Sequence, residues 1–166
     1  MSSLPLSSSI RAHPWLQLSE RERSFFCGDE YLPLPESHAL QIASLEAEEG
    51  RRVIKWLLNP FDLRWTIESQ FPCKVVMQLG DKWNSEAGIQ TVRQWLHHRH
   101  VPYQRQVYLI YDYPQVVQMP WKLVVKYWDA LAWSVGVEML VLDSMRQWVC
   151  SFHHEDVITF CHFEAD

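Results

Sequence analysis

The pattern of hydrophobic and polar positions between Gln106 and Phe163 predicts extended structure interrupted by one helix. β-Branched and aromatic residues are dense in the first run of this block, which is typical of a half-buried or fully buried strand. Pro114 then provides turn chemistry, so the next apolar run returns as an antiparallel partner. Three further apolar runs joined by short turns predict a meander. The five expected strands are 106–112, 116–119, 137–143, 147–152 and 157–163.

The hydrophobic period changes from two to about 3.6 after Pro120, a residue that suits the first turn of a helix. Apolar residues between Trp121 and Ala132 follow the i, i+3, i+4, i+7 pattern and form one stripe. Lys122, Lys126 and Asp129 occupy the other faces. We therefore expect this helix to bury its apolar stripe against the sheet.

The N-terminal half favours helices that cover the sheet. Ser44 suits the cap of a helix over 45–58, and Ser85 suits the cap of a helix over 86–98. Each of these segments carries apolar residues at helical spacing. A short helical turn is expected over 37–42.

Other N-terminal stretches are less regular. Ser19 and Glu22 have the spacing of a capping box, which predicts a helical turn. The apolar runs 65–67 and 75–77 are each typical of an edge strand or of an anchored loop, and the pattern does not distinguish the two.

The chain as a whole predicts a single α+β domain. Its 166 residues are enough to bury most of the surface that the unfolded chain exposes. A flexible tail over 1–12 is expected to precede a domain over 13–166. The expected architecture is an antiparallel sheet of about five strands in the C-terminal half, packed against helices, with a mainly helical N-terminal half.

The composition argues against several functions. Fifteen Lys and Arg against twenty Asp and Glu give a formal net charge of -5, which disfavours general nucleic-acid binding. Only five glycines occur, and the usual phosphate-binding glycine patterns are missing from the sequence. We therefore expect neither nucleotide chemistry nor a bound cofactor.

Cysteine usage and hydropathy favour a reduced, cytoplasmic setting. The four cysteines have no CxxC spacing, and Met1–Ile10 has neither the basic nor the apolar region of a secretory signal. No apolar run approaches the roughly 18 to 20 residues of a membrane span, so we expect no membrane partner. The cysteines are interpreted as small buried hydrophobes. They are Cys27, Cys73, Cys150 and Cys161.

Nine tryptophans are unusual for a chain of this length. Trp121 and Trp128 are two helical turns apart and share a face, so they and Trp148 are expected to fill the core between helix and sheet. Alternatively, Trp133 and one of the others form an exposed aromatic anchor for a protein partner. Acidic residues near this block, including Glu138, would steer a basic partner. The candidate binding residues are Trp121, Trp128, Trp133, Asp143, Trp148, Glu155 and Asp156.

The tetrad from His153 to Asp156 combines imidazoles with carboxylates, which suits metal binding or general acid–base chemistry. Adjacent residues of a short turn point in different directions, however, so an exposed β-turn without a metal is the favoured interpretation. If a metal binds, the candidate ligands are His153, His154 and His162, with a cysteine as a further possibility.

A family resemblance rests on several segments taken together: Tyr31–Glu36, the helix ending near Trp56, Val107–Tyr108, Val116–Val117, Trp121, Tyr127–Trp128 and the closing meander. In this order they resemble a family of small bacterial proteins known only as a domain of unknown function. The resemblance implies a bacterial, cytoplasmic, compact single domain, and it assigns no catalytic residue. A looser similarity to bacterial toxin-immunity proteins rests on size, acidity and tryptophan content.

These observations leave three hypotheses for the function. The first is a non-enzymatic, immunity-like protein-interaction domain that binds a basic partner. The second is a small metal-binding protein or hydrolase that uses the turn from His153 to Asp156. The third is a homodimer in which a sheet edge or an aromatic face pairs with its own copy.

Overall fold

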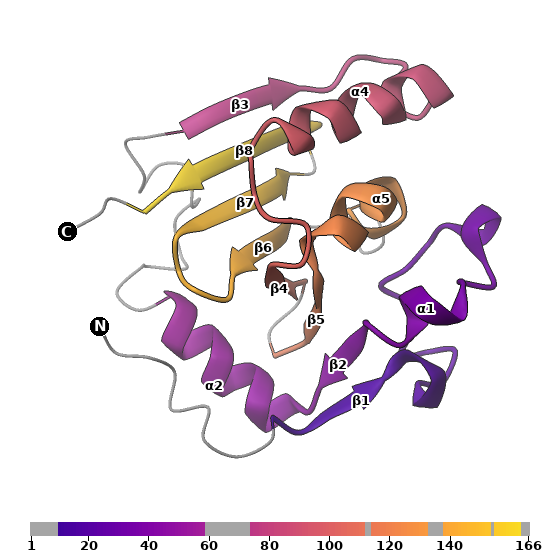
Figure 1. Cartoon of the computed structure of the whole chain (residues 1–166), viewed down its shortest axis with the longest axis vertical. Helices are drawn as coiled ribbons and strands as arrows, with labels where there is room; N and C mark the ends of the chain where they lie inside the picture. The colour runs from indigo at the N-terminus through magenta and orange to yellow at the C-terminus, as the bar shows by residue number, and fades with distance from the viewer. Residues whose placement is uncertain (1–9, 59–73, 112–113, 133–137, 154, 164–166) are drawn as a thin grey trace.

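An antiparallel sheet of eight strands forms the centre of the fold in the computed structural model, which describes residues 10–58, 74–111, 114–132, 138–153 and 155–163. The strand order is β1-β2-β5-β4-β6-β7-β8-β3, so β1 and β3 are the two edges (Figure 1). The strands are β1 (Ala12–Pro14), β2 (Ala43–Leu45), β3 (Lys74–Gln78), β4 (Gln106–Ile110), β5 (Val116–Pro120), β6 (Met139–Asp143), β7 (Trp148–His153) and β8 (Val157–His162). The described helices are α1 (Glu36–Ala39), α2 (Ala47–Leu58), α4 (Glu86–His97) and α5 (Trp121–Leu131), with 3₁₀ turns at Trp15–Gln17 and Asp29–Tyr31.

The prediction of about five strands and a mainly helical N-terminal half is wrong, because β1, β2 and β3 join the sheet from the N-terminal side. β1 and β2 have three residues each, which is too few for a period of two to be recognised in the sequence. Ser44, expected to cap a helix, instead lies in β2 opposite Val117 of β5. The run 75–77 is an edge strand because it pairs with β8, far away in the sequence.

The three longer helices expected around the sheet are all present. α4 begins after Ser85, whose Oγ accepts a hydrogen bond from the Gly88 N–H at 3.1 Å. α5 begins directly after Pro120, as the change of period predicts. α2 starts two residues later than expected, at Ala47, because β2 precedes it. Among the described helices, none is long and apolar enough to cross a membrane.

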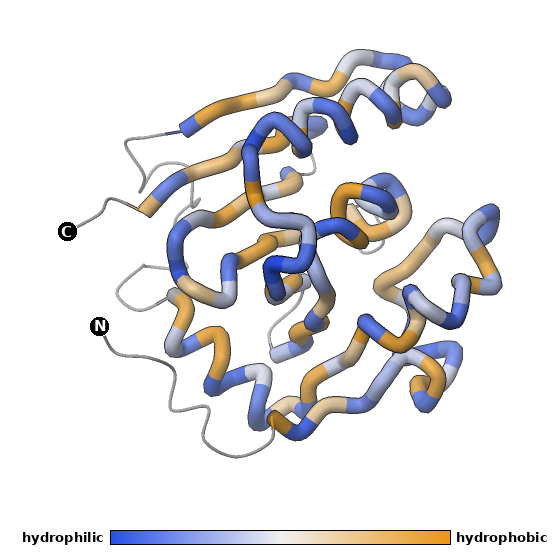
Figure 2. The backbone as a smooth tube through the Cα atoms, in the orientation of Figure 1, coloured by the Kyte–Doolittle hydropathy of each residue, from blue (hydrophilic) through white to orange (hydrophobic). Residues whose placement is uncertain are grey.

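Both faces of the sheet are covered, so most residues of its central strands are buried. Alternate residues of β7, such as Trp148 and Cys150, face a cluster formed with α4, α5 and the segment 15–42. The intervening Val149 faces a second cluster, formed with α2. Figure 2 shows the central strands largely in hydrophobic colours, whereas hydrophilic and hydrophobic positions alternate along α2 and α4.

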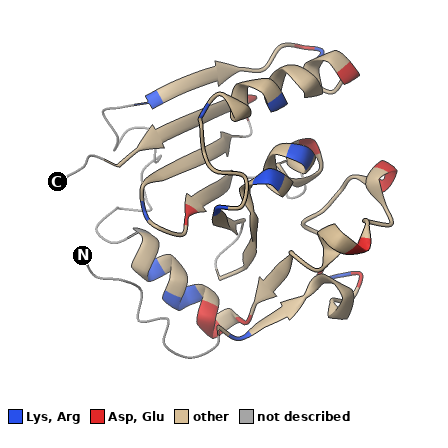
Figure 3. Cartoon of the chain, viewed as in Figure 1, with Lys and Arg blue, Asp and Glu red and all other residues tan. Residues whose placement is uncertain are grey.

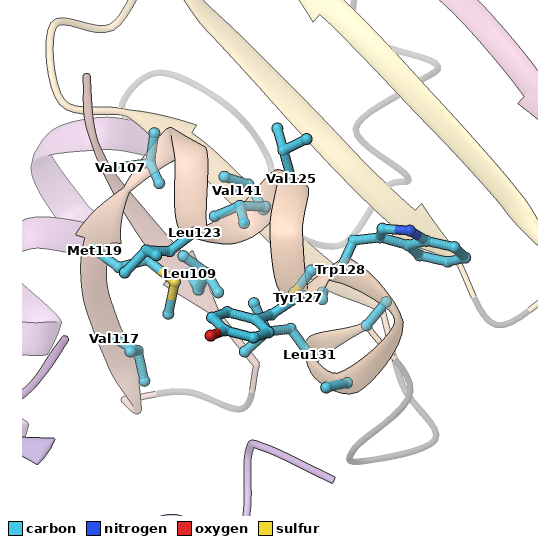
Figure 4. Packing of buried hydrophobic residues seen from close by; sticks show 14 of the residues in the cluster. Val107, Leu109, Val117, Met119, Leu123, Val125, Tyr127, Trp128, Leu131 and Val141 are labelled. Carbon is cyan, nitrogen blue, oxygen red and sulfur yellow. The ribbon is translucent and has the colours of Figure 1, made fainter. Parts of the chain in front are cut away.

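α5 packs along the middle of the sheet (Figure 4). Its Leu123, Tyr127, Trp128 and Leu131 lie in one buried cluster with residues of β4, β5 and β6. The helix bends at Tyr127, where φ is -114° and ψ is 19°. At this bend the Tyr127 hydroxyl reaches His38 Nδ1, which lies outside the sheet.

A buried ion pair closes the hairpin between β6 and β7. Asp143 is fully buried, and its two carboxylate oxygens accept hydrogen bonds from Arg105 Nη1 at 3.0 and 3.1 Å. The Gln147 N–H also donates to Asp143 Oδ2, at 2.9 Å. The carboxylate therefore holds both ends of the turn and the segment that leads into β4.

Replacing Asp143 by Ala should lower the free energy of unfolding by about 3 kcal/mol or more, because it leaves the Arg105 guanidinium largely buried without its partner. Urea unfolding followed by far-ultraviolet circular dichroism measures this change. Glu155→Ala is the matched control, because that carboxylate is exposed in the next turn of the same meander. It should change stability by less than about 0.5 kcal/mol. Equal effects of the two substitutions would contradict a structural role for the buried pair.

Candidate functional site

The segment between β1 and β2 forms an open groove at one end of the sheet. Its volume is about 880 Å³. We call it the N-terminal groove, and its walls combine apolar, acidic and basic side chains. The lining residues are Trp15, Leu16, Glu20, Arg23, Ser24, Phe26, Cys27, Asp29, Leu32, Pro33, Leu34 and Ala39.

Aromatic packing holds the inner wall of the groove in place. The buried Trp15 ring meets the Phe25 and Phe26 rings edge to face, with centroids 5.8 and 5.7 Å apart. Arg23 donates from Nη2 and Nε to the Trp15 carbonyl at 2.9 and 3.1 Å, and its guanidinium lies over the Trp15 ring. This guanidinium therefore acts mainly as a brace for the wall.

A capping box fixes the start of the turn that leads into the groove, as its sequence spacing predicts. The Ser19 N–H donates to Glu22 Oε2 at 2.7 Å, and the Glu22 N–H donates to Ser19 Oγ at 3.3 Å. These hydrogen bonds lower the pKa of Glu22, so its carboxylate is charged at neutral pH.

Large apolar side chains are exposed at the groove. Leu16 is 57% exposed and Leu32 is 43% exposed, and both line it. Leu40, next to the lining residue Ala39, is 63% exposed. Single exposed apolar side chains are normal on protein surfaces, whereas two that line one groove mark it as a candidate binding site.

The segment around the groove is acidic. Residues 19–40 contain five carboxylates and two guanidinium groups, so they carry a formal net charge of -3 within a chain of net charge -5. One of the two guanidinium groups is Arg23, which is held against Trp15. Figure 3 shows the acidic positions on and near α1. The carboxylates are Glu20, Glu22, Asp29, Glu30 and Glu36.

A polar network behind the groove connects the N-terminal segment to α4 and α5. Tyr31 donates to Asp129 Oδ2 at 2.7 Å, and Arg93 Nη2 donates to the Tyr31 hydroxyl at 3.1 Å and to the Lys126 carbonyl at 2.7 Å. Burial, followed by the Asp129 carboxylate, raises the pKa of Tyr31 to about 12. Tyr31 is therefore a neutral hydrogen-bond donor that ties the groove to α5.

A second polar contact lies at the bend of α5. His38 Nδ1 and the Tyr127 hydroxyl are 2.7 Å apart, and the tautomer of the imidazole decides which of them donates. Burial, together with the positive charges of Lys126 and Lys122, lowers the pKa of His38. Burial also raises the pKa of Tyr127. Both groups are therefore neutral at neutral pH, which suits a positioning contact between α1 and α5.

The binding residues predicted from the sequence do not form one surface, because some are buried and others are exposed. Trp121, Trp128 and Trp148 are between 0 and 4% exposed and belong to the core cluster, as the core alternative expects. Asp143 is buried with Arg105 and so lies away from the surface where a partner would meet it. Glu155 and Asp156 are exposed in the turn between β7 and β8, and Trp133 lies outside the described residues.

The candidate metal ligands are also separated. His153 pairs with Val157, and His162 pairs with Trp148, so the two histidines lie at opposite ends of the β7–β8 hairpin. Five residues of extended chain separate these ends, which corresponds to about 17 Å. His154 lies outside the described residues. Within the described part of the chain, no group of three or more His, Cys, Asp or Glu side chains is placed to hold a metal ion.

Strand register likewise keeps two of the cysteines apart. Cys150 lies opposite Phe160, whereas Cys161 lies opposite Val149, so the two thiols face opposite sides of the sheet. Both are buried, and burial strongly raises the pKa of Cys150. Cys27 is exposed at the N-terminal groove, so the expectation that the cysteines are buried is wrong for this residue. Cys73 lies outside the described residues.

Sequence reasoning missed the groove because its residues have no periodic pattern. The prolines around Leu32 give no periodic signal, yet this stretch places Leu32 in an exposed wall. The one local signal was the capping box of Ser19 and Glu22, which marks an ordered turn beside the groove. Comparison with protein-family models, with curated proteins and with solved structures found no match to this chain.

The lowered pKa of His38 makes the stability of the protein depend on pH. In the unfolded chain His38 has its ordinary pKa of 6.5, so as the pH falls through this value the unfolded state takes up a proton more readily than the folded state. The free energy of unfolding should therefore fall as the pH falls below 6.5. His38→Asn, whose amide occupies the position of Nδ1, should lose this contribution. Urea unfolding of both proteins between about pH 7.5 and about pH 5 measures the difference.

Lys126→Gln is the second variant for this prediction, because it removes one of the two positive charges that lower the pKa of His38. Its pH dependence should lie between those of the wild type and His38→Asn. If the free energy of unfolding changes with pH equally in all three proteins, His38 is not the source of the pH dependence.

Proposed function

We propose that this protein is a non-enzymatic, cytoplasmic protein-interaction domain that binds a basic, partly apolar segment of a partner protein in the N-terminal groove. The observation that carries the proposal is the combination of exposed Leu16 and Leu32 with acidic side chains in one groove. A role like that of toxin-immunity proteins would be one form of this function.

The apolar part of the groove supplies the contact area. Leu16 and Leu32 are accessible, whereas Trp15 and Phe26 form a buried aromatic wall behind them. Protein interfaces have such an apolar centre surrounded by polar groups. A partner side chain placed against the two leucines would remove their surface from water, which stabilises the complex.

The acidic part of the groove selects the charge of the partner. Glu20 and Asp29 are exposed lining residues, whereas the lining Arg23 is held by the Trp15 carbonyl. The lining therefore carries two exposed carboxylates against one guanidinium that is turned toward the wall, a formal net charge of -1. Complementary charge increases the rate of association and disfavours acidic partners, so Lys and Arg are the expected charged residues of the bound segment.

The groove is held rigid before a partner binds. The capping box at Ser19, the brace from Arg23 and the hydrogen bond from Tyr31 to Asp129 each fix a different part of its wall. Preorganisation of this kind reduces the entropy lost on binding.

Selection from a random peptide library displayed on phage tests the proposal. The purified full chain should enrich peptides in which Lys or Arg stands next to large apolar residues. The double substitution Leu16→Gln and Leu32→Gln should weaken binding of a selected synthetic peptide at least about tenfold, or about 1.4 kcal/mol. Met145→Gln is the control, because Met145 is 62% exposed at a distant turn.

A charge-matched pair of variants separates the acidic contribution from the apolar one. Glu20→Gln with Asp29→Asn should slow association and reduce its dependence on salt. Glu155→Gln with Asp156→Asn removes the same charge from the turn between β7 and β8 and should leave binding unchanged. No enrichment of peptides, or binding that both groove variants leave intact, would overturn the proposed function.

A further inference from the structure

The edge strand β3 is exposed in a way that sheet edges usually avoid. Val75 is 43% exposed and Val76 is 46% exposed, and consecutive strand residues point to opposite faces. Neither face of the sheet is therefore fully covered at this edge. Figure 1 shows β3 at the end of the sheet, beyond β8.

β3 has few of the features that protect sheet edges. Edges are commonly kept from pairing by charged side chains, above all Lys, by proline, by a bulge, by an inward-pointing charge, by a covering helix or loop, or by shortness. Of these, β3 carries one lysine, Lys74 at its first position, and no strand among the described residues pairs with its outer side. β3 has five residues, no proline, and an unbroken register with β8 from Lys74 to Gln78. At the opposite edge, β1 has three residues and ends at Pro14, which has no N–H to donate. The two edges of the same sheet thus differ in their readiness to accept another strand.

The hydrogen-bonding direction of β3 follows from the residue after it. The Leu79 N–H donates to the Asp156 carbonyl at 2.8 Å, so the polar backbone groups of Leu79 point toward β8. Along an antiparallel strand these groups alternate in direction, so those of Met77 and Val75 also point toward β8. Those of Lys74, Val76 and Gln78 consequently point away from the sheet.

These outward-pointing groups are complementary to a second copy of themselves. When two β3 strands are placed antiparallel about a two-fold axis at Val76, Val76 meets its own copy and Lys74 meets Gln78. All five residues then have a partner, and the outward groups can form about six hydrogen bonds. The only charged residue of the strand is Lys74, and this register places it opposite an uncharged amide.

The same register also brings apolar side chains of the two copies together. Val75 and Met77 share the face of the sheet that carries α4, because they pair with Phe160 and Ile158 of β8. In the symmetric pair, Val75 of each copy faces Met77 of the other. Met77 lines a depression of about 370 Å³ between β3 and α4, together with Leu79 and Trp83. Pairing would therefore extend an existing apolar surface across the axis.

We propose that this chain forms a homodimer in which the β3 strands of two copies pair antiparallel about a two-fold axis at Val76, which joins two eight-stranded sheets into one. A five-residue strand pair buries less surface than the roughly 1,200 to 2,000 Å² of stable interfaces, so dissociation in the micromolar range is expected. The proposal does not depend on the N-terminal groove, which lies at the opposite end of the sheet.

Val76→Pro tests the backbone contacts. Proline removes the N–H that points away from β8, so the ladder within the monomer stays complete while the central hydrogen bonds between copies are lost. Sedimentation velocity of the full chain over a range of concentrations should show a monomer–dimer equilibrium for the wild type and a monomer for the variant. Val76→Thr keeps the N–H and a β-branched side chain, and it should retain the dimer. Circular dichroism and thermal unfolding confirm that each variant is folded.

A charge exchange at the axis provides a second test that keeps the backbone unchanged. Val76 faces its own copy, so Val76→Lys brings two positive charges together and Val76→Glu brings two negative charges together. Each variant alone should be monomeric, whereas an equimolar mixture should recover a dimer. A monomeric wild type up to high micromolar concentration would overturn the proposal and leave the edge for a strand of another protein. A dimer that persists in Val76→Pro, or a mixture that stays monomeric, would likewise overturn it.

Discussion

Burial of the central strands on both faces is the constraint on which the rest of this fold depends. Residues Val107–Ile110 of β4 are between 0 and 8% exposed, although successive side chains point to opposite sides of the sheet. A strand of this kind is stable only when both faces are covered, since apolar area left in water costs about 25 cal/mol per Å². α5, α4 and the segment 15–42 cover one face, and α2 covers the other.

This constraint also explains the form of the N-terminal segment. Residues 15–42 contain little regular structure, yet they supply aromatic side chains to the cluster on the α5 side of the sheet. Their polar backbone and side-chain groups are then satisfied locally, through Arg23, the capping box and Tyr31. The N-terminal groove lies within this segment, between the residues that it places over the sheet.

The sequence predicts those elements whose signal is local. β4 to β8 and α5 carry a clear hydrophobic period, and the β4–β5 and β6–β7–β8 segments place consecutive strands side by side in the sheet. β6 is the exception, because it follows β5 and α5 in the chain but pairs with β4. β1, β2 and β3 could not be predicted in the same way, because their partners lie far away in the sequence. The separation of His153 from His162 and the burial of Asp143 also depend on strand register, which single residues do not reveal. The groove was missed for a related reason, because Leu16 and Leu32 are brought together only by the packing of the segment around them.

The position of β3 in the sheet has a consequence for the order in which the chain folds. β3 precedes β4 to β7 in the sequence, but its partner β8 follows them. During synthesis from the N-terminus, Lys74–Gln78 must therefore remain without its partner strand until β8 has left the ribosome. Pairs formed between such distant segments are slow to close, since the chain between them must first be ordered. Pairing of β3 therefore has to wait for β8, whatever the order in which β4 to β7 assemble.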